Sequence, residues 1–160
     1  MNLVFVTAEP ARLGEIDRLI RTAFTPYLRA LGREIAPDAY GWFAEAIVRG
    51  DIFAALDGQE IVGAIATRRP AEGEWELALI GVSPTRQKSG IASWMIGQVE
   101  SIARARGVQA LTLVTAEMME DRVRLYSRHG FRIARRGPQA EGKDPHIRVY
   151  MRKDLRGIGT

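Results

Sequence analysis

The chain contains no cysteine, only two histidines, and no apolar run near the roughly 18 residues that a membrane-spanning helix needs. Without cysteine there is no disulfide, no thiolate nucleophile and no cysteine-ligated metal. The histidines, His129 and His146, lack both the spacing of metal ligands and the partners of a catalytic triad. The N-terminus has no basic segment ahead of an apolar one, so we expect no signal peptide and a cytoplasmic protein.

A length of 160 residues predicts a single domain with a sizeable core. We place this domain at residues 1–153 and expect 154–160 to be a frayed tail. The net charge of +4 could indicate nucleic-acid binding. However, no aromatic residues interleave with the arginines as a base-stacking surface requires. We therefore expect a solvated basic surface, with neither nucleic acid nor a membrane as partner.

The first third of the chain predicts helices and a hairpin. Pro26 interrupts a helical pattern, so we expect it to end the first helix or to start the next. The pair Asp57-Gly58 stands between two apolar runs, which is a strong hairpin signal because both residues tolerate a positive φ. The predicted elements are a strand at 3–6, helical segments from 9 to 32, a helix at 37–48, and strands at 52–56 and 61–67.

The stretch from Glu74 to Arg106 is the centre of the chain. The near-continuous apolar run from Glu74 to Val82 predicts a strand that is covered on both faces, and Pro84 ends it. From Ile91 the apolar residues recur at helical spacing, and Gly107 closes the predicted helix.

The turn between this strand and this helix is a candidate phosphate site. A helix N-terminus has unpaired N–H donors and a partial positive charge. Arg86 and Lys88 add full charges, and Gly90 has no Cβ that would push a phosphate away. The alternative is an ordinary strand-to-helix turn.

The remaining elements complete an α/β fold. Residues 110–115 predict a strand parallel to 74–82, because a helix connects the two. We expect a helix at 118–128, strands at 131–135 and 146–151, and a loop at 137–145. These elements predict a mixed, mostly antiparallel central sheet of about seven strands, flanked by helices, with one parallel pair.

Two blocks of sequence resemble a known family. Val-x-Pro-x-x-Gln-x-x-Gly-x-Ala at residues 82–92 resembles the acetyl-CoA motif of the GCN5-related N-acetyltransferase (GNAT) superfamily. Leu-Tyr-Ser-Arg-His-Gly-Phe at 125–131 resembles its Leu-Tyr-x-x-x-Gly-Phe block. The resemblance covers residues 2–152 and implies an enzyme that moves the acetyl group of acetyl-CoA to a primary amine by direct transfer in a ternary complex.

The resemblance also implies which residues hold the cofactor, acetyl-CoA. The end of the central strand would bind the pantetheine arm and the turn would bind the pyrophosphate. Met119 stands where many family members have an asparagine that contacts the cofactor. No metal is implied. The implied cofactor residues are Ile80, Gly81 and Val82 for the pantetheine, and Gln87, Lys88, Ser89, Gly90, Ile91 and Ala92 for the pyrophosphate.

Tyr126 matches the family tyrosine that protonates the departing thiolate. A tyrosine hydroxyl has an ordinary pKa of about 10, close to that of an alkyl thiol, so proton transfer between them is nearly balanced. The alternative is an amphipathic tyrosine that packs with Met119 and Val123 in a helix.

Glu76 is the candidate general base, because it is a carboxylate within an apolar strand and burial raises the pKa of a carboxyl group. It shares a strand face with Ala78, Ile80 and Val82. The alternatives are a glutamate that reaches solvent or pairs with an arginine, with Glu74 or a chain of waters acting as base instead.

Three further questions stay open at this point. A catalytically silent acyl-CoA-binding regulatory module would have the same fold, although Tyr126 favours an enzyme. The acceptor would be a small-molecule or peptide amine, whose site Tyr27, Trp42 and Phe43 are candidates to line. The sequence does not distinguish a monomer from a homodimer.

Overall fold

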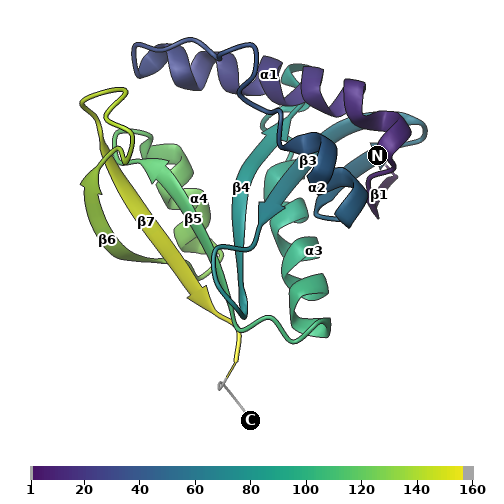
Figure 1. The fold of residues 1–160 in the computed structure, drawn as a ribbon. Helices are drawn as coiled ribbons and strands as arrows, with labels where there is room; N and C mark the ends of the chain where they lie inside the picture. The colour runs from purple at the N-terminus through teal and green to yellow at the C-terminus, as the bar shows by residue number, and fades with distance from the viewer. Residues whose placement is uncertain (1, 157–160) are drawn as a thin grey trace. The chain divides into compact units, whose positions relative to one another are not determined.

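The computed structural model describes residues 2–156 (Figure 1). They fall into two compact units, each of which is described by itself. Unit 1 consists of the residues up to Arg68 together with Ala78–Gln98. Unit 2 consists of Arg69–Leu77 and the residues from Val99 onward. The single domain expected for residues 1–153 stays a prediction.

Seven strands form a mixed sheet in the order β1-β2-β3-β4-β5-β7-β6. The pair β4–β5 is parallel, and β1–β2, β2–β3, β5–β7 and β6–β7 are antiparallel. The predicted α/β fold with one parallel pair is therefore confirmed. The strands are β1 (Leu3–Thr7), β2 (Ile52–Asp57), β3 (Glu60–Arg68), β4 (Glu74–Val82), β5 (Ala110–Ala116), β6 (Arg132–Pro138) and β7 (Ile147–Asp154).

The helices are α1 (Leu13–Ala30), α2 (Phe43–Arg49), α3 (Ile91–Ala105) and α4 (Glu120–Arg128), with 3-10 turns η1 (Pro10–Arg12) and η2 (Pro84–Arg86). Within residues 2–156, none of the helices combines the length and the apolar character that crossing a membrane would require.

The expected break at Pro26 is wrong, since α1 continues through it to Ala30. A proline costs a helix one backbone hydrogen bond, but packing can outweigh that loss. Here Ile16, Ile20 and Ala23 are buried along the helix, and Leu31 directly after it is only 2% exposed. Apolar contacts on both sides of the proline thus hold α1 together.

The helix expected from Pro37 begins only at Phe43. Residues 38–42 form turns instead, in which the Gly41 N–H donates to the Asp38 carbonyl (3.1 Å) and the Phe43 N–H to the Tyr40 carbonyl (3.0 Å). Aspartate and glycine favour such turns over helix. The rings of Tyr40 and Phe43 stack with centroids 4.9 Å apart, which fixes the turn against the start of α2.

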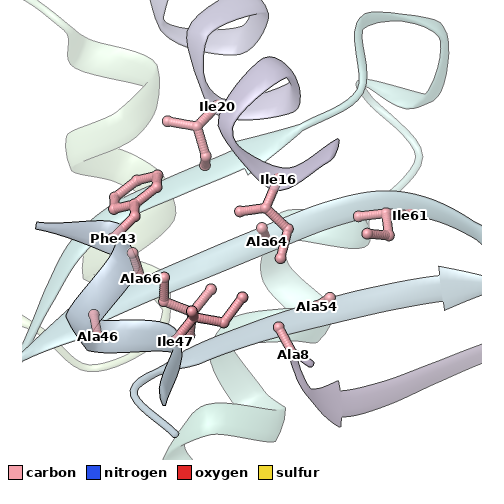
Figure 2. Close-up of a cluster of buried hydrophobic side chains, with 11 residues drawn as sticks. Ala8, Ile16, Ile20, Phe43, Ala46, Ile47, Ala54, Ile61, Ala64 and Ala66 are labelled. Carbon is pink, nitrogen blue, oxygen red and sulfur yellow. The ribbon is translucent and has the colours of Figure 1, made fainter. Parts of the chain in front are cut away.

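Unit 1 has a core of small and branched apolar side chains (Figure 2). Side chains of α1 and α2 point toward β2 and β3, where alanines leave room for them. The strand β3 is buried along almost its whole length. The cluster comprises Ala8, Ile16, Ile20, Phe43, Ala46, Ile47, Ile52, Ala54, Ile61, Ala64 and Ala66.

Unit 2 contains the parallel pair, in which Glu74–Glu76 of β4 lies in register with Ala110–Thr112 of β5. The last strand is longer than expected, because β7 runs to Asp154 and Leu155 is buried. The Leu155 N–H donates to the Gln109 carbonyl (2.8 Å). The predicted tail therefore starts too early, and its residues 157–160 lie outside the described part of the chain.

Candidate cofactor loop and catalytic residues

The turn after β4 is anchored to its neighbours in unit 1. The Ser83 N–H donates to the Val62 carbonyl of β3 (2.9 Å), and the Arg86 N–H donates to the Ser83 carbonyl (2.8 Å), which closes η2. The Arg86 guanidinium donates to Asp57 (2.8 Å) and Glu60 (3.3 Å) of the β2–β3 hairpin. The hydrogen bond to Asp57 raises the pKa of Arg86. Arg86 thus ties the turn to the hairpin, rather than standing as the phosphate-facing charge that the sequence predicted.

Two residues of this turn have a left-handed backbone. Lys88 has φ 64° and Gly90 has φ 83°, and Lys88 is the only non-glycine residue with positive φ among residues 2–156. This conformation costs an ordinary residue about 1–2 kcal/mol. Gln87, directly before Lys88, has an extended backbone (φ −67°, ψ 154°). The left-handed residues thus bend the chain into the start of α3, and a helix N-terminus suits a phosphate.

The space beside Gly90 is open. A Cβ built on Gly90 would meet no protein atom within 4 Å, so packing does not explain why a glycine stands there. Residues 87–90 are exposed, and Ser89 donates its hydroxyl to the Arg86 carbonyl. The Trp94 N–H donates to the Gly90 carbonyl (3.0 Å), which begins α3, and the preceding N–H groups of a first helical turn have no partner within the helix.

The end of β4 is buried in unit 1. Ile80 and Val82 are 8% and 9% exposed. A Cβ on Gly81 would lie 3.0 Å from the Ile20 Cδ1 and 3.3 Å from the Ala23 Cβ. Gly81 is therefore explained by the close approach of α1 to β4, independently of any cofactor.

Glu76 lies in the part of β4 that belongs to unit 2, half-buried and in register with Thr112. Glu74 forms a salt bridge with Arg152, whose guanidinium donates a hydrogen bond to the Glu74 carboxylate (2.7 Å). This hydrogen bond raises the pKa of Arg152. Arg152 also pairs with Asp154 (2.9 Å). Glu74 is thus part of an ion-pair network, and the role of Glu76 as the base stays a prediction.

Tyr126 lies in the last turn of α4 and is 6% exposed. The Phe131 N–H donates to the Tyr126 carbonyl (3.1 Å) and the Gly130 N–H to the Ser127 carbonyl (3.0 Å). With Gly130 at φ 89° and an edge-to-face contact between the rings of Tyr126 and Phe131, this is a Schellman cap. Capping explains the glycine and the two rings of the block.

The structure groups the predicted residues by unit. All the predicted cofactor residues belong to unit 1, and both candidate catalytic residues belong to unit 2. Across residues 2–156, no three His, Asp or Glu side chains gather as a metal site would need. The left-handed Lys88 had no sequence signal, because lysine does not favour that conformation.

The chain matches the model of the acetyltransferase (GNAT) family over residues 15–131. This span contains every predicted cofactor and catalytic residue. An IAA acetyltransferase from Azospirillum brasilense is 35% identical over 97 residues. That alignment covers 59% of this chain and 61% of the relative, so the chain matches less than two thirds of the relative's length.

Solved structures share the fold at low identity. The paia N-acetyltransferase of Thermoplasma acidophilum, in complex with coenzyme A, has a TM-score of 0.75 at 16% identity, over 96% of this chain and 99% of that one. A Bacillus subtilis acetyltransferase, also in complex with CoA, has a TM-score of 0.76 at 19% identity, over 97% and 100%. These likenesses confirm the predicted fold.

Proposed function

The chain belongs to the acetyltransferase (GNAT) family, and from that premise we propose that it is an N-acetyltransferase that uses acetyl-CoA. The observation that carries the proposal is the turn from Ser83 to Gly90. It combines two left-handed residues, an open space beside Gly90 and the N-terminus of a helix of 15 residues. An anionic diphosphate fits such a turn.

The residues of this turn would hold the cofactor mainly through the backbone. Gly90 admits the ligand because no side chain fills the space beside it. Lys88 adds a positive charge next to the N–H groups of α3. When bound, acetyl-CoA supplies an acetyl thioester, whose C–S bond breaks as the bond between acetyl carbon and amine nitrogen forms. The proposed set is Ile80, Gly81 and Val82 for the pantetheine arm, with Gln87, Lys88, Ser89, Gly90, Ile91 and Ala92 for the pyrophosphate.

The proton transfers fall to two side chains of unit 2. The Glu76 carboxylate takes a proton from the acceptor's ammonium group and so makes the nitrogen nucleophilic. The Tyr126 hydroxyl gives its proton to the departing sulfur. The second proton that the nitrogen loses, on forming the amide, then restores the phenol. One proton in total is released, through Glu76, to solvent.

A silent acyl-CoA-binding module is the second candidate function. The Schellman cap at the end of α4 favours it, because the cap alone accounts for most of the Leu-Tyr-x-x-x-Gly-Phe block. Phenylalanine would serve that cap as well as Tyr126 does. The presence of a hydroxyl at this position therefore favours the enzyme over the module.

The test is turnover with a panel of amines. We expect the protein to release CoA from acetyl-CoA only when an acceptor is present, with the primary amine acetylated in equal amount. The amount of free thiol measures the CoA released, and the mass of the product identifies the acetylated amine. Binding of acetyl-CoA without amine-dependent release of CoA for any member of the panel would instead identify the silent module.

A further inference from the structure

The register of unit 2 shows which side chains share a sheet face with Glu76. Glu76 of β4 is in register with Thr112 of β5, Thr112 with Arg152 of β7, and Arg152 with Arg132 of β6. Side chains of residues paired in register project from the same face of a sheet. One row thus runs from the proposed base across the three following strands.

The next row on the same face is partly apolar and accessible. Val114 of β5 is in register with Tyr150 of β7, and Tyr150 with Arg135 of β6. Val114 is 41% exposed, and Thr112 and Tyr150 are half-buried. The face beside Glu76 therefore offers an apolar surface that ends at an arginine.

Arg135 lies over the ring of Tyr150, with its guanidinium carbon 3.6 Å from the ring centroid. A stacked guanidinium keeps its N–H donors in the plane of the group, where they can bind a carboxylate through two hydrogen bonds.

Within the described residues, no carboxylate neutralises the charge of Arg135. Three other arginines of β6 and β7 do have carboxylate partners: Arg136 pairs with Glu117, Arg148 with Asp144, and Arg152 with Glu74 and Asp154. Arg135 is held in place by an aromatic ring instead, which leaves its donors for a ligand.

Resting on the proposed function, we propose that the acceptor is a primary amine that also carries a carboxylate. Its nitrogen faces Glu76, its apolar body lies over Val114 and Tyr150, and Arg135 binds its carboxylate. The strands of Glu76 and Tyr150 are two inter-strand spacings apart, about 10 Å, so the acceptor is extended. A polyamine would set a second ammonium group against Arg135, and this like-charge contact selects against it.

The test compares acceptors that differ only in charge. The probes are para-aminomethylbenzoate, its neutral counterpart para-aminomethylbenzamide, and spermidine. The proteins are the parent, Arg135→Gln and the control Arg136→Gln, which removes the same charge from the same strand at a residue paired with Glu117. For each protein we measure the melting temperature with and without acetyl-CoA and kcat/KM for CoA release. Calorimetry measures the binding of each probe to the CoA-loaded protein.

We expect the parent to prefer the benzoate by about tenfold or more in kcat/KM and in affinity, as one charge-assisted hydrogen bond would produce. Arg135→Gln should remove this preference, and Arg136→Gln should keep it. If the parent uses benzoate and benzamide equally, or if Arg135→Gln keeps the preference, the acceptor proposal is overturned. Neither result contradicts the proposed acetyltransferase function. No rise in melting temperature with acetyl-CoA would overturn the proposed function itself, and this proposal with it.

Discussion

The two units differ in what holds them together and in what carries their chemistry. Unit 1 is held by apolar packing: β2 and β3 are buried, and the cluster behind them contains alanine, isoleucine and a phenylalanine. Its candidate site, the turn from Ser83 to Gly90, presents backbone groups. Neither the packing nor the site depends on a group that titrates near neutral pH.

Unit 2 differs in having ion pairs whose two side chains are both largely buried. Asp144 and Arg148 form a salt bridge of 2.8 Å with side chains only 2% and 8% exposed. Glu100 of α3 accepts from Lys153 of β7 (2.6 Å) and from Arg104 (3.0 Å). The edge strand β6 is exposed along nearly all of its length. The candidate functional groups here are side chains: a carboxylate, a phenol and a guanidinium.

This difference predicts that the two regions respond differently to substitution. A backbone site tolerates many side-chain changes but not a new atom in the ligand's space. A side-chain site loses its function when a single hydroxyl or carboxylate is removed. Substitutions in unit 1 should therefore act on cofactor binding, and substitutions in unit 2 on rate and on pH dependence.

Tyr126→Phe should have the largest effect on rate. The ring and the Schellman cap remain, so only the hydroxyl proton is lost. We expect kcat and kcat/KM to fall together by about 10² to 10⁴-fold, the usual contribution of a general acid. Steady-state rates of CoA release measure this, with the affinity for acetyl-CoA unchanged.

Tyr40→Phe is the matched control, because it removes a hydroxyl from a half-buried tyrosine of unit 1 whose pKa is raised by burial. It should leave kcat unchanged. A Tyr126→Phe protein with the parent rate would show that the hydroxyl serves no acid role. A loss of cofactor affinity in that protein would contradict the assignment of cofactor binding to unit 1 and of catalysis to unit 2.

Glu76→Gln should lower kcat/KM by about 10²-fold at neutral pH. The loss should shrink as the pH rises toward the pKa of the acceptor amine, because the amine then loses its proton without help. A pH–rate profile measures this. Glu72→Gln, the same change at an exposed residue before β4, serves as control. A loss that is equal at every pH would indicate a structural role for Glu76.

Glu100→Gln should have the smallest effect, and on stability rather than rate. Burial alone would raise the pKa of Glu100, but hydrogen bonds from Lys153 and Arg104 outweigh it and lower the pKa below 4.5. A carboxyl whose folded-state pKa is lowered contributes stability above its unfolded-state pKa, and loses it as the pH falls through the folded-state value. Solvent screening keeps the contribution near or below about 1 kcal/mol.

The melting temperature of Glu100→Gln should thus be about 2–4 °C lower than that of the parent at neutral pH. The gap should close as the pH falls below 4.5. Glu45→Gln, at an exposed glutamate of α2, should show no such gap. An equal difference in melting temperature at all pH values would contradict the link between the lowered pKa of Glu100 and stability.

Much of the fold follows from local sequence signals. The apolar run gives β4 its observed bounds, Glu74–Val82, and Asp57-Gly58 lies at the hairpin between β2 and β3. Helical spacing and Gly107 bound α3. The prediction failed at Pro26, where tertiary packing carries the helix through the proline. It failed at residues 37–42 because turn-forming residues outweigh the helical pattern.

The candidate sites divide in the same way. The proposed cofactor turn could be located from the sequence, because its glycine and its place between a strand and a helix are visible there. The proposed role of Arg135 could not be predicted, because it depends on the register between β5, β7 and β6 and on a bulge between Ile133 and Arg135. Register depends on contacts between residues distant in the chain, which no local pattern records.

The measurement that tests the central claim most directly is calorimetric titration of acetyl-CoA into three proteins: the parent, Gly90→Glu and Gly107→Glu. Gly90 and Gly107 flank opposite ends of α3, both have left-handed backbones, and a Cβ on either would meet no protein atom within 4 Å. The two substitutions therefore carry the same strain and the same charge. We predict that the parent and Gly107→Glu bind acetyl-CoA alike, and that Gly90→Glu does not bind it. Equal binding by all three proteins would contradict the assignment of the turn as the cofactor site.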